Sequence, residues 1–205
     1  MLVKVCGISE SNFVHRIDEL DVEFIGFIFY EKSKRYLADK ISGDLIKTIP
    51  KEINKVGVFV NEDKDKVLKH VHKYQLDFVQ LHGDEDEKYV QNLSRNVKVI
   101  KVFRIDEYFN FNTTKSFEGF SHYFLFDTKA KEYGGTGRKF NWDLINRYNG
   151  NTPFLLSGGI NREDTNHIKE FRHSKFIGID INSGFEVIPG IKDINKIKIF
   201  LNQLS

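Results

Sequence analysis

The chain has 205 residues, of which 40% are hydrophobic and 29% charged, a composition typical of a globular protein with one core. Its 31 lysines and arginines and 29 aspartates and glutamates leave a formal net charge of +2, so the composition gives no sign of a nucleic-acid or membrane partner. One cysteine excludes an internal disulfide, and no apolar run reaches the roughly 18 residues that a membrane helix needs. We therefore expect one cytoplasmic domain over residues 1–205.

Eight short apolar runs, rich in Val, Ile and Phe, alternate with helix-like segments, and several runs are apolar almost without interruption. Such runs are typical of parallel strands that are buried on both faces. We expect strands within residues 2–8, 22–30, 54–61, 78–83, 97–105, 122–129, 153–160 and 175–182.

Apolar residues recur at helical spacing between these runs, most clearly in 11–20, 64–76 and 194–204. The segment 106–120 gives the weakest helix prediction, because asparagines and threonines crowd it. Ser9 and Asn161 are candidate N-caps.

Eight strand–helix pairs of about 26 residues each fit a (β/α)8 barrel, the TIM barrel. The alternative is a doubly wound open sheet. No glycine-rich fingerprint follows the first run, which favours the closed barrel.

In such a barrel the active site lies at the carboxyl ends of the strands. Two glycine-bearing segments follow the seventh and eighth runs, SGGI at 157–160 and DINSGFE at 180–186. Either alone is more simply read as a turn. Together they predict a phosphate site, because glycine lets backbone N–H groups approach an anion and barrels commonly hold phosphate after these two strands. The residues at the eight strand ends are Cys6, Tyr30, Asn61, His82, Arg104, Asp127, Ser157 and Asp180.

Cys6 and Asp127 flank the two glycine-bearing loops, since closure places strands 7 and 8 between strand 6 and strand 1. Taken alone, Cys6 is better explained as a small buried apolar residue, and Asp127 equally well as a helix cap or an ion-pair partner. Their joint position on opposite sides of a bound sugar phosphate predicts a proton-transferring isomerisation, with a base acting at a carbon and an acid at an oxygen.

Three further features lie near the predicted mouth. The segment 127–142 contains Gly135 and Gly137 and is predicted to form a lid or to add anion-binding amides. Arg35 follows the second strand, where its guanidinium could hold a carboxylate, although a solvated charge is the simpler reading. His82 is read as hydrogen-bonded scaffold or as a possible substrate contact. No cluster of His, Cys, Asp and Glu has metal-ligand spacing, so we expect no metal.

The chain resembles the phosphoribosylanthranilate isomerase family in motifs that stand in the family's order from Val3 to about Asn195: KVCGI, GFIFYEKSKRYL, VGVFVN, VQLHGDE, FDTKAKEYGGTGRKFNWDLI, LLSGGI and IDINSGFEVIPGIKD. The resemblance implies a (β/α)8 barrel that acts in tryptophan biosynthesis without cofactor or metal. The implied reaction is the Amadori rearrangement of N-(5-phosphoribosyl)anthranilate to 1-(2-carboxyphenylamino)-1-deoxy-D-ribulose 5-phosphate.

The resemblance also implies a role for each matching residue. Asp127 is the general acid that protonates the ribose ring oxygen, Cys6 is the general base that removes the C2′ proton, and Arg35 meets the anthranilate carboxylate. The phosphate-binding positions are Gly135, Gly137, Gly158, Gly159, Asp180, Asn182, Ser183 and Gly184. The expected partner is a small-molecule sugar phosphate, and the sequence leaves monomer and homodimer both open.

Three positions depart from the family pattern. Ser33-Lys34-Arg35 stands where Ser-Pro-Arg is usual, so we expect the arginine loop to lose the rigidity of proline. Asn182-Ser183 replaces a serine pair, and Asn141-Trp142 replaces Asp-Trp as a helix cap.

At neutral pH the ordinary protonation states of a cysteine and an aspartate are the reverse of the assigned roles. We expect the positive end of a neighbouring helix, and the iminium charge formed after ring opening, to favour the Cys6 thiolate.

The alternatives are other functions of a phosphate-binding barrel. A histidine-pathway isomerase would carry an acidic residue at the end of strand 1, where this chain has Cys6. A metal-dependent epimerase lacks ligands, and a barrel that binds a phosphorylated ligand without turnover should have lost Cys6 or Asp127.

Overall fold

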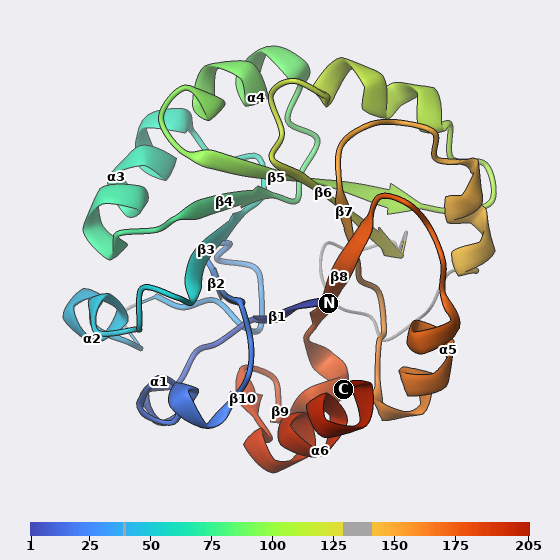
Figure 1. The fold of residues 1–205 in the computed structure, drawn as a ribbon. Helices are drawn as coiled ribbons and strands as arrows, with labels where there is room; N and C mark the ends of the chain where they lie inside the picture. Colours follow the sequence, from blue (N-terminus) through green and yellow to red (C-terminus); the bar gives the residue numbers. More distant parts are fainter. Residues whose placement is uncertain (39, 129–140) are drawn as a thin grey trace.

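The structure is a computed structural model, which describes residues 1–38, 40–128 and 141–205. Eight parallel strands form a closed barrel in which each strand pairs with the next in the chain and β8 pairs with β1 (Figure 1). The strands are β1 (Leu2–Cys6), β2 (Phe24–Ile28), β3 (Asn54–Phe59), β4 (Phe78–Leu81), β5 (Lys98–Ile105), β6 (Tyr123–Thr128), β7 (Phe154–Leu156) and β8 (Phe176–Ile181). The predicted (β/α)8 barrel is confirmed, and the open sheet is excluded by the pairing of β8 with β1.

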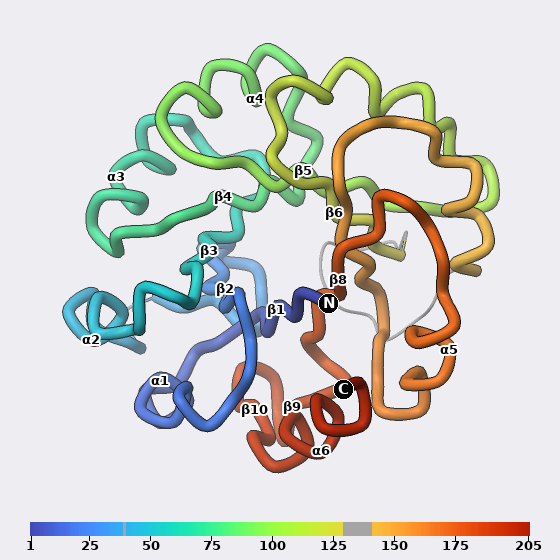
Figure 2. The backbone as a smooth tube through the Cα atoms, in the orientation of Figure 1, coloured from blue at the N-terminus to red at the C-terminus, as the bar shows by residue number. Residues whose placement is uncertain are grey.

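Helices surround the strands as an outer ring, which the backbone trace also shows (Figure 2). The α-helices are α1 (Ser11–His15), α2 (Gly43–Lys47), α3 (Lys64–Tyr74), α4 (Glu87–Ser94), α5 (Thr165–Glu170) and α6 (Ile194–Leu204). The 3-10 helices are η1 (Ile17–Glu19), η2 (Phe111–Phe117), η3 (Trp142–Arg147), η4 (Arg162–Asp164) and η5 (Ser183–Phe185). A two-stranded hairpin, β9 (Glu186–Ile188) and β10 (Ile191–Lys192), lies with α6 in the sector between α1 and α5 (Figure 1). Among the described residues, none of these helices combines the length and the apolar character needed to cross a membrane.

The strongest helix predictions agree best with the structure. The segments 64–76 and 194–204 contain α3 and α6, whereas 11–20 is divided into α1 and η1, and the weak segment 106–120 forms only η2. Asn161 is confirmed as an N-cap, because its side chain accepts a hydrogen bond from the backbone of η4.

Ser9 is not the N-cap of α1. That position is held by Glu10, without a side-chain cap, and the Ser9 hydroxyl instead donates to the Gly190 carbonyl at 3.0 Å. Ser9 therefore links the loop of the β9–β10 hairpin to the segment that follows β1.

The barrel interior has an apolar floor and a polar upper layer. The floor is a cluster of buried side chains from successive strands: Phe24, Val56, Phe78, Ile100, Val102, Leu125 and Leu155. Toward the carboxyl ends of the strands the interior positions carry Lys4, Cys6, Gln80, Asp127 and Asp180. Polar side chains that could act on a ligand are therefore concentrated at the predicted mouth.

Candidate active site

A pocket at the carboxyl ends of the strands brings together residues that are far apart in the sequence. Cys6, Arg35, His82, Asp127, Ser157 and Asp180 line it together with Gly158, Gly159, Asn182 and Ser183. Of the other strand-end residues, Tyr30, Asn61 and Arg104 lie outside this lining. The Arg104 guanidinium instead pairs with Asp84.

Cys6 shares the interior face of β1 with Lys4, because residues two apart in a strand point to the same side. Lys4 is fully buried and its Nζ donates to Asp180 Oδ1 at 2.9 Å. Gly26 on β2 leaves room for both side chains. A Cβ at Gly26 would lie 2.8 Å from Cys6 Sγ and 3.1 Å from Lys4 Nζ. The thiol and the ammonium therefore meet in one narrow space.

Two lysines near Cys6 oppose the effect of its burial on the thiol pKa, and Asp180 adds to that effect, so the thiol pKa stays above its ordinary value. Burial raises the pKa of the Cys6 thiol above its ordinary value, and the Lys4 ammonium lowers that pKa through its charge and a hydrogen bond. Asp180 raises the thiol pKa, and Lys192 lowers it. Burial lowers the pKa of Lys4, but the adjacent Asp180 and Cys6 raise it above its ordinary value, so Lys4 stays charged. The positive group beside the sulfur is thus a lysine, where we expected the end of a helix.

Asp127 and His82 form a pair on the opposite side of the pocket. His82 Nε2 lies 3.1 Å from Asp127 Oδ2, and the other carboxylate oxygen accepts from the Thr128 backbone at 2.8 Å. Gln80 Nε2 lies 3.4 Å from His82 Nδ1, so with Gln80 as donor the imidazole carries its proton on Nε2 and donates to Asp127. His82 is thus the partner of Asp127 within the pocket lining, and its role as a substrate contact stays a prediction.

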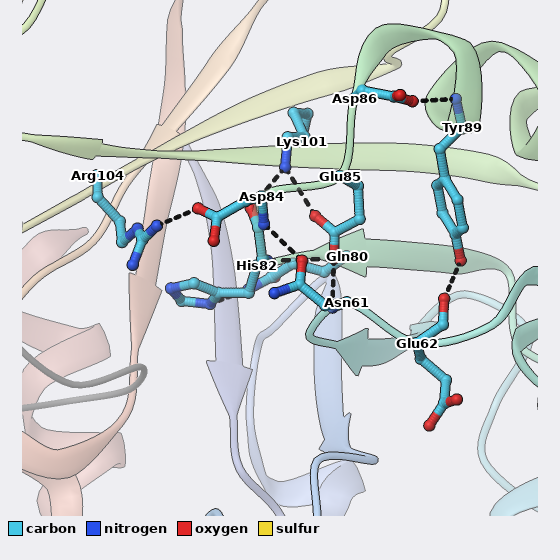
Figure 3. Close-up of polar contacts among 11 residues, drawn as sticks. Asn61, Glu62, Gln80, His82, Asp84, Glu85, Asp86, Tyr89, Lys101 and Arg104 are labelled. Atoms are coloured by element: carbon cyan, nitrogen blue, oxygen red, sulfur yellow. Dashed lines mark hydrogen bonds and ion pairs between the residues drawn. The ribbon is translucent and has the colours of Figure 1, made fainter.

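The loop after His82 is held by a buried ion pair (Figure 3). Lys101 Nζ donates to the Gly83 carbonyl at 2.9 Å and to Glu85 Oε2 at 2.8 Å. Glu85 Oε1 in turn accepts from the backbone of Asn61 at 2.9 Å and of Gly83 at 3.2 Å. Burial lowers the pKa of Lys101 below its ordinary value, and Glu85 opposes this effect. This cluster, which we call the outer brace (Lys101, Glu85, Gly83 and Asn61), fixes the ends of β3 and β4.

Glycines allow the loop after β7 to approach the end of β6 and the loop after β8 closely. Gly158 and Gly159 have φ of +93° and +74°, which side chains rarely adopt. A Cβ on Gly158 would collide with Thr128, and one on Gly184 would collide with the Ile160 carbonyl. Among the residues that the structure describes, no group accepts a hydrogen bond from the amides of Gly158 and Gly159. Two amides at the pocket wall are therefore available to an anion.

Arg35 is held at the edge of the pocket by Glu186. Its Nε and Nη2 donate to the two Glu186 oxygens at 2.8 and 2.7 Å, and Glu186 also accepts from Lys192 Nζ at 2.6 Å and from the Gly190 backbone at 2.9 Å. The Ser33 hydroxyl accepts from the Arg35 backbone at 3.1 Å. These contacts order the loop that lacks the family's proline.

Gly135 and Gly137, and with them the predicted lid, lie outside the described residues. Within the described ranges no group of three His, Cys, Asp or Glu side chains is placed to hold a metal ion.

Sequence reasoning missed Lys4 and the Glu186–Lys192 pair. A lysine two residues before Cys6 in an otherwise apolar strand was the available signal for Lys4.

Comparisons with known proteins cover the whole chain. The family model for N-(5'phosphoribosyl)anthranilate (PRA) isomerase matches residues 3–203. The N-(5'-phosphoribosyl)anthranilate isomerase of Parabacteroides distasonis is 44% identical over 209 residues, which cover 100% of this chain and 93% of that protein.

Two solved structures are similar in fold and sequence. A phosphoribosyl anthranilate isomerase in complex with reduced 1-(o-carboxyphenylamino)-1-deoxyribulose 5-phosphate has a TM-score of 0.84 and 30% identity, covering 100% of this chain and 98% of that one. A structure of monomers of the dimeric isomerase from Thermotoga maritima has a TM-score of 0.79 and 30% identity, with the same coverage.

Proposed function

The chain belongs to the N-(5'-phosphoribosyl)anthranilate isomerase family, and from this premise we propose that Cys6 is its general base and Asp127 its general acid. The protein is an isomerase of tryptophan biosynthesis. The observation that carries the residue assignment is that both side chains line one pocket, with the loops after β7 and β8 between them in barrel order.

The reaction requires two proton transfers at opposite sides of the ribose. Asp127, in its protonated form, gives its proton to the ring oxygen, the C1′–O bond breaks, and the anthranilate nitrogen supplies the electrons that form an iminium ion. Cys6 as thiolate then removes the proton from C2′, which gives an enolamine. Tautomerisation of the enolamine yields the ketone product without any cofactor.

The two ends of the substrate fit the two walls of the pocket. We assign the phosphate to the loops after β7 and β8, where the Gly158 and Gly159 amides are free of other described acceptors. The assigned positions are Gly158, Gly159, Asn182, Ser183 and Gly184, together with Gly135 and Gly137 of the family motif. Asp180 belongs to this set only through its backbone, because its carboxylate pairs with Lys4 and would repel a phosphate.

Arg35 is assigned to the anthranilate carboxylate. Its Nε and Nη2 atoms bind Glu186, which leaves Nη1 as a donor for the ligand. Glu186 thereby fixes the plane of the guanidinium before the substrate arrives.

The remaining expectations concern the whole protein. We propose that residues 1–205 form one domain, which the closed barrel supports. A cytoplasmic location fits a biosynthetic enzyme with one reduced cysteine. All the residues assigned above come from one chain, so a monomer is sufficient for the site and a homodimer is compatible with it.

The test is a fluorescence assay in which a transferase makes phosphoribosylanthranilate in situ from anthranilate and phosphoribosyl pyrophosphate. We expect the protein to accelerate loss of the substrate's fluorescence, and Asp127→Asn and Cys6→Ser each to lower kcat by about 10²-fold or more. Circular dichroism establishes that each variant is folded. Near-full turnover by either folded variant would contradict the role assigned to that residue. If the wild type did not accelerate the decay, the assignment of phosphoribosylanthranilate as the substrate would be wrong.

A further inference from the structure

We propose that Lys4 is a positioning residue whose buried ammonium holds and stabilises the Cys6 thiolate, and that Asp180 limits how much of this positive charge acts on the sulfur. The inference rests on the assignment of Cys6 as general base. It concerns the groups beneath the thiol rather than those that touch the substrate.

Three observations place the ammonium against the sulfur. Lys4 and Cys6 lie two residues apart on β1 and face the barrel interior together. Both approach the same point above Gly26, where a Cβ would lie 2.8 Å from Sγ and 3.1 Å from Nζ. Lys4 is fully buried, so bulk water screens its charge from the thiol only weakly.

A lysine at this level of the barrel has no evident structural advantage. The register partner of Lys4 on β2 is Phe24, and the interior below is apolar. Replacing a buried ion pair with apolar side chains of similar volume is often neutral or stabilising, so the ion pair by itself contributes little to the fold. The sulfur beside it supplies a reason for keeping a charge there.

The charges that face Cys6 come from several elements. Lys4 approaches from β1, Asp180 from β8 and Lys192 from β10, while β2 presents the uncharged Gly26. The remaining charged or titratable groups of the pocket lining are Arg35, His82 and Asp127. Lys4 is the cation with the largest effect on the thiol, and Asp180 is paired with Lys4.

This arrangement predicts opposite effects for the two members of the ion pair. Lys4→Met removes the cation and should raise the thiol pKa, by about 1 to 3 for the loss of an opposite charge at close range. Asp180→Asn removes the anion that opposes Lys4 and should lower the thiol pKa. A merely structural ion pair would lose stability in both variants without moving the thiol pKa in opposite directions.

Cys6 is the chain's only cysteine, so alkylation of the native protein by iodoacetamide reports on this thiol alone. We would measure the alkylation rate from pH 6 to 10. At pH 8 we expect Lys4→Met to react about tenfold more slowly than the wild type or slower still, and Asp180→Asn to react faster. Lys101→Met is the matched control, a buried lysine paired with a carboxylate in the outer brace, and it should leave the thiol pKa unchanged.

If Lys4→Met does not fold, the double variant Lys4→Met/Asp180→Asn removes both charges and takes its place. Its thiol pKa should exceed that of Asp180→Asn alone. Equal thiol pKa values in this comparison, or no displacement in folded Lys4→Met, would overturn the proposal.

The pH dependence of kcat separates this inference from the assignment on which it rests. If Cys6 is the base, the rising limb of kcat should move to higher pH in Lys4→Met together with the thiol pKa. A displaced thiol pKa in Lys4→Met, combined with full turnover by Cys6→Ser, would retain the effect of Lys4 on the sulfur and reject the base. Loss of turnover in Cys6→Ser with an unmoved thiol pKa in Lys4→Met would retain the base and reject the role of Lys4.

Discussion

Two of the buried lysine–carboxylate pairs in this barrel have nearly the same separation, yet their surroundings give them different roles. Lys4 Nζ lies 2.9 Å from Asp180 inside the barrel, and Lys101 Nζ lies 2.8 Å from Glu85 in the outer brace. Each lysine lies between two apolar neighbours in its strand. The pKa of Lys4 is raised, whereas burial lowers the pKa of Lys101.

The difference lies in what else each pair contacts. The outer brace satisfies backbone groups at the ends of β3 and β4, so its hydrogen bonds are used within the scaffold. The pair inside the barrel contacts a thiol that lines the pocket. Burial and an ion pair are therefore not enough to identify a functional lysine. What separates Lys4 from Lys101 is the further group that each pair contacts, a thiol in one case and backbone groups in the other.

The largest predicted effect is the fall in kcat when that third group, the Cys6 thiol, is removed. Cys6→Ala is expected to lower kcat by about 10² to 10⁴, the usual contribution of a general base. Because Lys4 acts through the sulfur, adding Lys4→Met to Cys6→Ala should lower kcat little further, whereas independent residues would show additive losses. Steady-state kinetics of the single and double variants measure this coupling, and additive losses would contradict it.

Breaking the outer brace should mainly affect stability. Lys101→Met leaves the buried Glu85 carboxylate unpaired, so we expect the free energy of unfolding to fall by about 3 to 5 kcal/mol in urea denaturation. The double variant Lys101→Met/Glu85→Gln should recover part of this loss. Lys66→Met, which breaks the solvent-exposed pair with Glu62, is the control and should cost less than about 1 kcal/mol. Equal losses in Lys101→Met and Lys66→Met would show that the brace is not structural.

His82 precedes Gly83 of the outer brace and pairs with the proposed acid Asp127. Removing it should lower kcat by less than the removal of Cys6 does. His82→Ala loses the hydrogen bond to Asp127, and a bond to a charged group is worth about 1.5 to 3 kcal/mol, or roughly 10- to 100-fold in kcat. KM should change less than kcat, since His82 acts through Asp127. His72→Ala, at an exposed position of α3, provides the control, and a fall confined to KM would assign His82 to substrate binding instead.

The smallest predicted effect concerns Lys192, a third buried lysine, whose contribution to the free energy of unfolding should depend on pH. Burial lowers the pKa of Lys192 to about 8, whereas the pKa of a lysine in the unfolded chain is about 10.4. Between these values the unfolded chain binds more protons, so the contribution of Lys192 to the free energy of unfolding should rise with pH, by about 2 kcal/mol at most from pH 8 to 10. Urea denaturation of the wild type and Lys192→Met measures the difference.

The same linkage argument gives the opposite sign for Lys4, whose pKa is raised. Its contribution to stability is present below about 10.4 and is lost only above that value, so it should stay flat from pH 8 to 10. A rise for Lys4 like that for Lys192 would show that the two buried lysines do not differ as their surroundings indicate.

Much of the architecture follows from local pattern. Uninterrupted apolar runs such as FIGFI in β2 require burial on both faces, which parallel strands in a barrel provide. The strand ends then place Cys6 and Asp127 at one mouth, and the glycines after β7 and β8 mark the loops between them. These features depend on periodicity and chain order, which the sequence states directly.

The contacts between charged groups were decided only by the tertiary structure. Lys4 meets Asp180 because barrel closure sets β8 beside β1, and Arg35 meets Glu186 because the β9–β10 hairpin folds back to the loop after β2. No local pattern encodes pairs that lie 176 and 151 residues apart. The sequence alone therefore determined the barrel and the position of the Cys6 thiol at the end of β1. Closure of the barrel determined which charges surround that thiol, because electrostatic interaction depends on distance in space.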